Sequence, residues 1–199
     1  VADRMPGVRK FMLGGTIPGY ESAEEAVRAM PATPVADETP GADMLYSSGT
    51  TGRPKGVKRA LTGGKLGEPN PLLMLAKMLY SFDENTTYLS PAPLYHAAPL
   101  RYNMTVHTLG GTTVVMEHFD PEQALALIGK YKTSHSQWVP TMFVRMLKLP
   151  EAARRKYDVS AMKVAIHAAA PCPIPVKKQM IEWWGPVIYA YYAGTEGNG

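Results

Sequence analysis

The sequence predicts an α/β fold in which a mostly parallel sheet is flanked by helices. From about residue 110 onward, segments typical of strands and of helices alternate as strand, helix, strand, helix, strand, helix, strand. The chain also contains 18 glycines and 18 prolines, which favour many turns and short elements over a helical bundle. Its 199 residues suit one ordinary domain or a piece of a larger one.

Composition narrows the class of protein. The formal net charge is +4 at pH 7, and the densest basic cluster, residues 154–156, is typical of a solvated helix face, so we expect no nucleic-acid partner. The single cysteine, Cys172, excludes a disulfide within the chain and fits a cytoplasmic protein.

No apolar run approaches the roughly 20 residues that span a bilayer, so any membrane association would be peripheral. The chain lacks a starting Met and a signal peptide, and we expect a fragment of a longer protein whose oligomeric state the sequence does not indicate.

The first 43 residues are expected to form an entry segment. A short apolar run closed by glycines predicts a strand at 10–15, and a helix is expected at 20–30. Ser22 can cap this helix and Glu25 can complete a capping box. A Pro-rich connecting loop follows.

Residues 46–56, with the sequence YSSGTTGRPKG, combine four Ser and Thr hydroxyls, three glycines and a Pro-Lys pair. Glycines let backbone N–H groups approach an anion, hydroxyls add donors and the lysine adds a mobile positive charge, which is typical of a phosphate cradle. Strands are expected on both sides of it, at 44–48 and 56–61. The Walker A loop does not fit, because a proline precedes and a glycine follows the lysine. A surface linker is the alternative, but a linker needs neither an apolar strand before it nor a rigid Pro-Lys pair.

The middle of the chain begins with a helix expected at 70–82. The apolar residues at helical spacing are expected to form its buried stripe. These are Leu72, Leu75, Ala76 and Leu79. The elements expected next are a strand at 86–90, a loop at 91–100, a helix at 101–111 and a strand at 112–117.

The helix expected at 120–132 has strong start signals. Asp120 can cap it, Pro121 occupies its first position and Gln123 can close a capping box. The remaining expected elements are strands at 134–140, 163–167 and 186–192, helices at 141–149 and 174–184, and a turn at 168–173. The last helix carries Trp183 and Trp184, of which one is expected in the core and one at the surface.

Four segments resemble signatures of the adenylate-forming superfamily, which includes acyl-CoA synthetases, peptide-synthetase adenylation domains and beetle luciferases. YSSGTTGRPKGV resembles its phosphate-binding signature, and LYHAAP (94–99) resembles its aromatic and histidine segment by the acyl site. IHAAAPCP (166–173) resembles the small-residue turn beside adenine, and YYAGTEG (191–197) resembles the Y-G-x-T-E signature. The surrounding sequence, including WVPTMF (138–143), looks most like bacterial fatty-acid–CoA ligases.

The resemblance implies part of the large N-terminal domain of an adenylate-forming enzyme. Its expected parts are an entry segment and loop at 1–43, a phosphate-loop hairpin at 44–61 and an α/β sheet region at 62–199. The family's C-terminal domain, its adenylation lysine and its ribose-binding aspartate would be absent, so we expect the fragment alone to be inactive.

The resemblance also implies a reaction. ATP and a carboxylic acid, with a fatty acid as the expected class, would form acyl-AMP and pyrophosphate with Mg²⁺ present, and coenzyme A would then accept the acyl group. An adenylation domain that serves a carrier protein is one alternative. A nucleotide-binding module without chemistry is another.

The site residues follow from the resemblance position by position. The residues expected at the ATP phosphates are Ser47, Ser48, Gly49, Thr50, Thr51, Gly52 and Lys55. The residues expected in catalysis are Lys55, Thr195 and Glu196, the last also at Mg²⁺. The residues expected around adenine are Tyr192, Ala169, Ala170 and Pro171, and those expected at the acyl group are His96, Trp138 and Ala193.

Some of these assignments have alternatives. A structural role for His96 has about equal weight, and Glu196 could be an ordinary exposed carboxylate. Ala168 and Ala193 stand where the family usually has glycine. His167 could shape the adenine turn or only pack, and Cys172 is expected to be a small apolar residue rather than a nucleophile.

Overall fold

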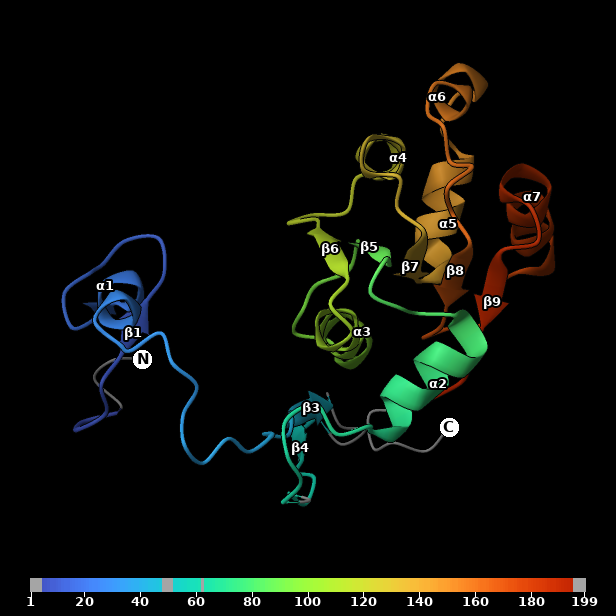
Figure 1. Cartoon of the computed structure of the whole chain (residues 1–199). Helices are drawn as coiled ribbons and strands as arrows, with labels where there is room; N and C mark the ends of the chain where they lie inside the picture. The colour runs from blue at the N-terminus through green and yellow to red at the C-terminus, as the bar shows by residue number, and fades with distance from the viewer. Residues whose placement is uncertain (1–4, 48–51, 62, 195–199) are drawn as a thin grey trace. The chain divides into compact units, whose positions relative to one another are not determined.

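The computed structural model describes residues 5–47, 52–61 and 63–194. The chain divides into two compact units, Val1–Thr39 and Pro40–Gly199. The second unit contains the predicted α/β region, and the expected mostly parallel sheet with flanking helices is confirmed (Figure 1).

The first unit has little secondary structure. Strands β1 (Phe11–Met12) and β2 (Glu21–Ser22) form a short parallel pair, followed by α1 (Ala23–Arg28). The predicted cap is confirmed, since the Ser22 hydroxyl accepts a hydrogen bond from the Glu25 N–H at 3.2 Å. The Ser22 hydroxyl in turn donates to the Glu24 carboxylate at 3.0 Å.

The second unit begins with the predicted hairpin. Strand β3 (Leu45–Ser47) pairs antiparallel with β4 (Lys55–Val57), so the expected order of strand, loop and strand is confirmed with shorter strands. In the register of the pair, Leu45 lies opposite Val57 and Ser47 lies opposite Lys55. The loop between the two strands is therefore closed by Ser47 and Lys55.

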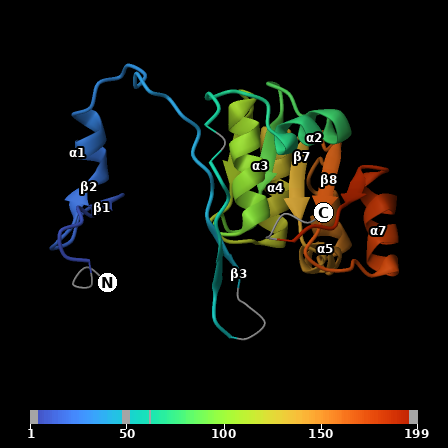
Figure 2. The same cartoon turned by 90° about the horizontal axis from the view of Figure 1, so that it is seen from below.

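The main sheet has five parallel strands in the order β6-β5-β7-β8-β9. The strands are β5 (Thr87–Ser90), β6 (Thr112–Val115), β7 (His135–Trp138), β8 (Val164–His167) and β9 (Ile188–Ala190). Figure 2 shows β7 and β8 side by side, in agreement with their parallel register. The alternation that predicted the sheet from residue 110 thus extends one strand earlier, to β5.

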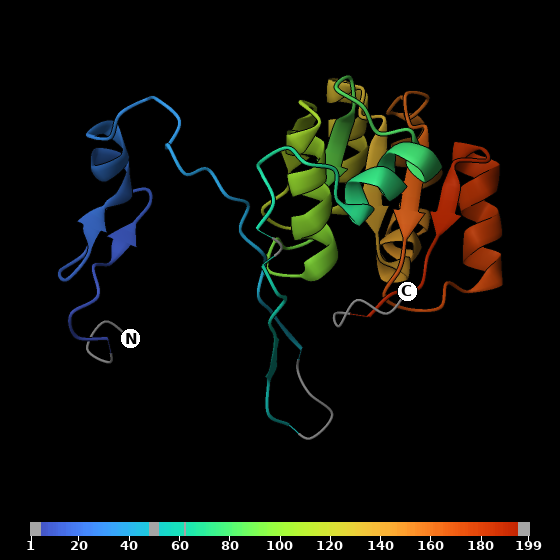
Figure 3. The same cartoon turned by 60° about the horizontal axis from the view of Figure 1, so that its bottom comes forward.

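Helices cover both faces of this sheet. On one face, α2 (Pro71–Tyr80) and α3 (Ala97–Thr108) pack against a core cluster that includes Tyr88 and Ile166, and Figure 3 shows these helices in front of the sheet. The other face is covered by α4 (Pro121–Tyr131), α5 (Pro140–Leu147) and α7 (Ile174–Trp184). A short helix, α6 (Glu151–Arg155), lies between α5 and β8 in the chain. Successive residues of β8 alternate between the faces, since Ala165 belongs to one cluster and Ile166 to the other.

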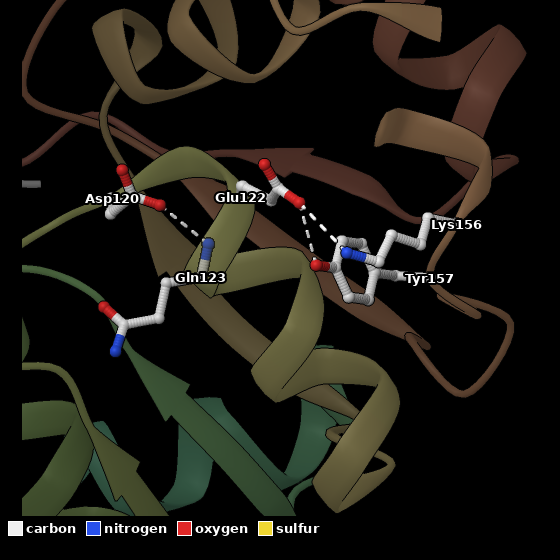
Figure 4. Close-up of polar contacts among 5 residues, drawn as sticks. All are labelled: Asp120, Glu122, Gln123, Lys156 and Tyr157. Atoms are coloured by element: carbon white, nitrogen blue, oxygen red, sulfur yellow. Dashed lines mark hydrogen bonds and ion pairs between the residues drawn. The ribbon is translucent and has the colours of Figure 1, made fainter. Parts of the chain in front are cut away.

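Local start signals explain why α4 begins where the sequence predicts. The Asp120 carboxylate accepts a hydrogen bond from the Gln123 N–H at 2.8 Å, and Pro121 follows at the first helical position. The expected capping box is only half formed, because the Gln123 side chain points away from Asp120 (Figure 4). Tyr157 instead donates to the Glu122 carboxylate at 2.9 Å and ties α4 to the segment after α6.

Two expectations about helices are wrong. The buried residues of α2 are Leu73, Ala76 and Tyr80, whereas Leu75 and Leu79 of the expected stripe are 41% and 59% exposed. Nearly every position of α2 is apolar, so more than one helical stripe fits the sequence.

The other error concerns a helix boundary. Helix α3 begins at Ala97, inside the expected loop, because Pro99 is tolerated in a first helical turn. The helix face expected around 154–156 agrees with α6, which ends at Arg155, although its five residues are too few to predict its start from a helical period.

Candidate functional site

The predicted site segments meet at one edge of the sheet. Because the five strands are parallel, their carboxyl ends lie at the same edge. The segment with His96 follows β5, the turn with Ala169 follows β8, and Tyr192 follows β9. The structure thus brings three predicted segments to a common edge.

The strand order singles out part of this edge. The chain runs from β5 to β6 through α3 on one face, and from β6 to β7 through α4 on the other. The order therefore reverses direction between β5 and β7, and such switch points leave a crevice in which open α/β sheets bind ligands. This geometric argument is independent of the sequence signatures.

The turn after β8 and the segment after β9 lie next to each other. The Tyr191 N–H donates to the His167 carbonyl at 3.3 Å, which extends the pairing of β8 and β9 beyond the last strand residues. The Tyr192 side chain is 90% exposed. The turn residues Ala169, Ala170 and Pro171 are exposed as well. The two expected adenine walls are thus neighbours and open to solvent, and adenine binding stays a prediction.

Ala169 has an uncommon backbone conformation. Its φ of 74° lies in the left-handed region, where a residue with a Cβ is strained. The sequence draws attention to Ala168, the position where the family usually has glycine, but the strain lies one residue later. Strained backbone is frequent in ligand-binding turns.

The described part of the phosphate hairpin has an exposed lysine and a tightly packed glycine. Lys55 is exposed and Ser47 partly buried, and they face each other at the mouth of the loop. Gly52 has a φ of 79°, which suits a glycine. A Cβ on Gly56 would lie 2.6 Å from Cε of Met44 and 3.2 Å from Cε1 of Tyr46.

Several predicted residues lie outside the described parts of the chain. They are Ser48, Gly49, Thr50, Thr51, Thr195 and Glu196. Their roles at the phosphates, in catalysis and at the metal stay predictions.

The three residues expected at the acyl group differ in their surroundings. His96 is exposed and immediately precedes α3, with its ring 4.5 Å from that of Tyr95. Ala193 is exposed, two residues after Tyr191. Both are accessible to a ligand, and their roles stay predictions.

Trp138 is fully buried. Its ring packs edge-on against Phe119 and Trp184 and lies 6.0 Å from Phe143, and its indole N–H donates to the Ser136 hydroxyl. The structure therefore gives Trp138 a packing role in the core. A second role at the acyl group stays a prediction.

His167 is buried at the carboxyl end of β8. Burial, together with the positive charge of Lys177, lowers the pKa of His167. Its ring packs edge-on against Phe143. Of the two roles considered from the sequence, the structure shows the packing role.

The thiol and the paired tryptophans also have clear surroundings. Burial raises the pKa of Cys172, which packs against the core, so its expected apolar role agrees with the structure. Trp184 is buried and Trp183 only partly so, which assigns the core and surface members of the pair.

Sequence reasoning missed one ionic contact near the site. Nη2 of Arg101 on α3 lies 2.8 Å from Oδ2 of Asp43, which precedes the hairpin by one residue. The two residues are 58 positions apart in the chain, and neither belongs to a recognisable motif. No local signal could have predicted the pair.

Among the described residues, no helix is long and apolar enough to cross a membrane.

Comparison with known proteins agrees with the geometry. Medium/long-chain-fatty-acid--CoA ligase FadD8 of Mycobacterium tuberculosis is 26% identical over 98% of this chain and 34% of its own length. The 4-coumarate--CoA ligase-like 8 of Arabidopsis thaliana is 31% identical over 78% of this chain and 28% of its own length. The chain thus spans about a third of the curated relatives that it matches.

A solved structure and a family profile complete the comparison. The amide bond synthetase McbA from Marinactinospora thermotolerans has the same fold, with a TM-score of 0.79 at 23% identity over 99% of this chain and 38% of that chain. The profile of the AMP-binding enzyme family matches residues 5–199. The resemblance seen in the sequence is thereby confirmed: this chain belongs to the AMP-binding enzyme family.

Proposed function

We propose that the protein carrying this chain is an ATP-dependent acyl-CoA synthetase. The observation that carries the proposal is the arrangement at the carboxyl edge, where the segment expected at the acyl group follows β5 and those expected at adenine follow β8 and β9 of the same parallel sheet. The family to which the chain belongs and the CoA ligases among its relatives support the same conclusion.

The reaction has two steps. A carboxylate oxygen of the acid attacks the α-phosphorus of ATP, the bond to the bridging oxygen breaks, and pyrophosphate leaves with acyl-AMP formed. The thiol of coenzyme A then attacks the acyl carbon, a thioester forms and AMP leaves.

The phosphate hairpin would act in the first step. Negative charge grows on the leaving pyrophosphate, so donors held in place stabilise the transition state more than they stabilise bound ATP. The donors are the backbone and hydroxyl groups of Ser47 to Gly52 and the ammonium of Lys55. The closed register between Ser47 and Lys55 would keep this set together.

Residues after β9 would hold the α-phosphate. Thr195 would donate to its oxygens, and Glu196 would supply the carboxylate that, with phosphate oxygens and water, suits Mg²⁺. The ion would neutralise phosphate charge when bound. Tyr192 would stack on adenine opposite Ala169, Ala170 and Pro171.

The surroundings of His96 favour an apolar acid. Leu94 is 41% and Tyr95 78% exposed in the segment after β5, at the switch point of the sheet. His96 would lie near the carboxylate end, with Trp138 behind it and Ala193 beside it. A fatty acid fits these surroundings, and a relative described as a medium- and long-chain fatty-acid–CoA ligase supports the class.

We assign the chain to the N-terminal adenylating domain of this enzyme. Residues 1–43 would lead into it, 44–61 would form the phosphate hairpin and 62–199 the α/β region. The boundary between the two compact units, at Thr39 and Pro40, lies close to the first of these divisions.

The proposal is tested by acid-dependent release of pyrophosphate. The protein carrying the chain is given ATP, Mg²⁺ and a panel of carboxylic acids of different lengths, and acyl-AMP is trapped with hydroxylamine. We expect release with apolar acids and transfer to coenzyme A. Nucleotide binding without acid-dependent release would indicate a binding module, and transfer to a carrier protein in place of coenzyme A would indicate an adenylation domain.

A further inference from the structure

The ion pair between Asp43 and Arg101 is unlike the other ion pairs of the described residues. Nε and Nη2 of Arg101 lie 3.0 and 2.8 Å from Oδ2 of Asp43. The two side chains are 18% and 19% exposed, whereas in the pair of Lys132 and Asp158 they are 62% and 53% exposed. Exposed pairs contribute little, but removing one partner of a shielded pair leaves the other charge poorly solvated.

The pair joins the hairpin to the helix that borders the switch point. Asp43 lies two residues before the first residue of β3, and Arg101 lies on α3, five residues after His96. The hairpin needs such an anchor, because its strands have only three residues each. Of those six strand residues, only Leu45 is buried.

Helix α3 also contacts the segment that leads to the expected adenine wall. The ring of Tyr102, next to Arg101 in the chain, lies 6.4 Å from the ring of Tyr191. Tyr191 in turn is held to the end of β8 by the hydrogen bond that its N–H donates to the His167 carbonyl. One helix thus supports the hairpin through Arg101 and the end of β9 through Tyr102.

We propose that the ion pair of Asp43 and Arg101 is a positioning device, which fixes the phosphate-binding hairpin against α3 and so sets its place relative to the carboxyl edge of the sheet. This inference rests on the proposed function, because the hairpin must hold the phosphates of ATP for its place to matter. Neither residue needs to touch the substrate.

The test removes and then reverses the pair in the protein carrying the chain. Asp43→Asn keeps the size of the side chain and removes its charge, and Arg101→Met removes the partner. We expect each variant to raise the KM for ATP about tenfold with a smaller change in kcat, because a misplaced hairpin weakens its hold on the phosphates. Amide hydrogen exchange in β3 and β4 is expected to accelerate severalfold, with exchange in β7 and β8 unchanged.

Two further variants make the result decisive. In the reversed pair, Asp43→Arg with Arg101→Asp, we expect the KM for ATP to fall part of the way back to that of the unaltered protein. We also expect amide exchange in β3 and β4 to slow again. Asp158→Asn, which removes an exposed carboxylate from a comparable pair, serves as the matched control and is expected to change neither.

The outcomes separate the two proposals. Unchanged KM and unchanged hairpin exchange in Asp43→Asn and Arg101→Met, or a reversed pair that recovers neither property, would overturn the positioning role while leaving the enzyme activity intact. If the unaltered protein releases no pyrophosphate with any acid, the proposed function fails, and the exchange measurement alone decides whether the pair anchors the hairpin.

Discussion

Ser47 and Lys55 lie directly opposite each other in the antiparallel pair of β3 and β4. The segment between them therefore starts and ends at paired strand residues, and Lys55 at its far end is exposed. A phosphate tail held in this loop would meet the lysine as it leaves with its growing charge.

The first prediction concerns this lysine. We expect Lys55→Ala to lower the rate of acid-dependent pyrophosphate release by about 10² to 10³, the usual cost of removing one preorganised donor from a transition state. Lys55→Arg keeps the charge with a different shape and is expected to be less impaired. Lys58→Ala removes an exposed lysine just beyond β4 and is the control. An undiminished rate and unchanged ATP affinity in Lys55→Ala would contradict the phosphate role.

The second prediction concerns the space beside Gly56. A methyl group there would lie 2.6 Å from Cε of Met44 and 3.2 Å from the ring of Tyr46. We expect Gly56→Ala to weaken ATP binding at most severalfold, measured by equilibrium dialysis, because the ends of the exposed Met44 and Tyr46 side chains must move aside. Adding Met44→Ala to that variant is expected to recover part of the affinity.

Gly41→Ala provides a control for this effect, because no atom lies within 4 Å of the position of its Cβ. If Gly56→Ala binds ATP as tightly as the unaltered protein, the close packing in the hairpin has no functional role.

The sequence predicted those features of the fold that depend on residues close together in the chain. The start of α4 was predicted because Asp120 and Pro121 lie next to each other and act on the same helical turn. The buried face of α2 was not predicted, because its apolar residues surround most of the helix and only the contact with Tyr102 and its neighbours selects one stripe. Long-range packing, not the local period, decides such a face.

The candidate site divides in the same way. His96, Ala169 and Tyr192 could be named from the sequence, because each lies in a short segment that resembles a signature of the family. The pair of Asp43 and Arg101 could not, because its members are ordinary charged residues 58 positions apart. The left-handed backbone of Ala169 gave no signal either, since alanine usually avoids that conformation.

The third prediction separates packing from substrate contact at Trp138. The ring is fully buried among Phe119, Phe143 and Trp184. We expect Trp138→Ala to lower the free energy of unfolding by about 3 to 5 kcal/mol in urea titration, the usual loss for a large aromatic side chain in a core. Trp183→Ala, at a partly exposed position, is the control with a smaller expected loss. A Trp138→Ala protein of normal stability with an altered acid preference would instead indicate an acyl-site residue.

The fourth prediction concerns the buried histidine of β7. Nε2 of His135 donates to the Tyr80 carbonyl at 2.8 Å and so links the end of α2 to the sheet, while Nδ1 lies 2.7 Å from the Ser134 hydroxyl. Burial lowers the pKa of His135 more than the hydrogen bond to the Tyr80 carbonyl raises it, and the smaller effects of Lys163 and Asp83 oppose each other. The folded protein therefore binds a proton at this site less readily than the unfolded chain does.

The sign of the pH effect follows from this difference. Above the pKa of an unfolded histidine, about 6.5, His135 is neutral in both the folded and the unfolded protein. Its contribution to the free energy of unfolding then does not change with pH. Below it the unfolded chain takes up the proton first, so stability falls as the pH is lowered until the folded protein also becomes protonated. His167, whose pKa is also lowered, contributes with the same sign.

Urea titrations at pH 7.5 and 5.5 measure the effect. We expect the unaltered protein to lose stability between these values and His135→Gln, which keeps an N–H donor for Tyr80, to lose less. His118→Gln replaces an exposed histidine and is expected to keep the full pH dependence. An identical loss in His135→Gln and in the unaltered protein would show that this imidazole is not the group that couples folding to pH.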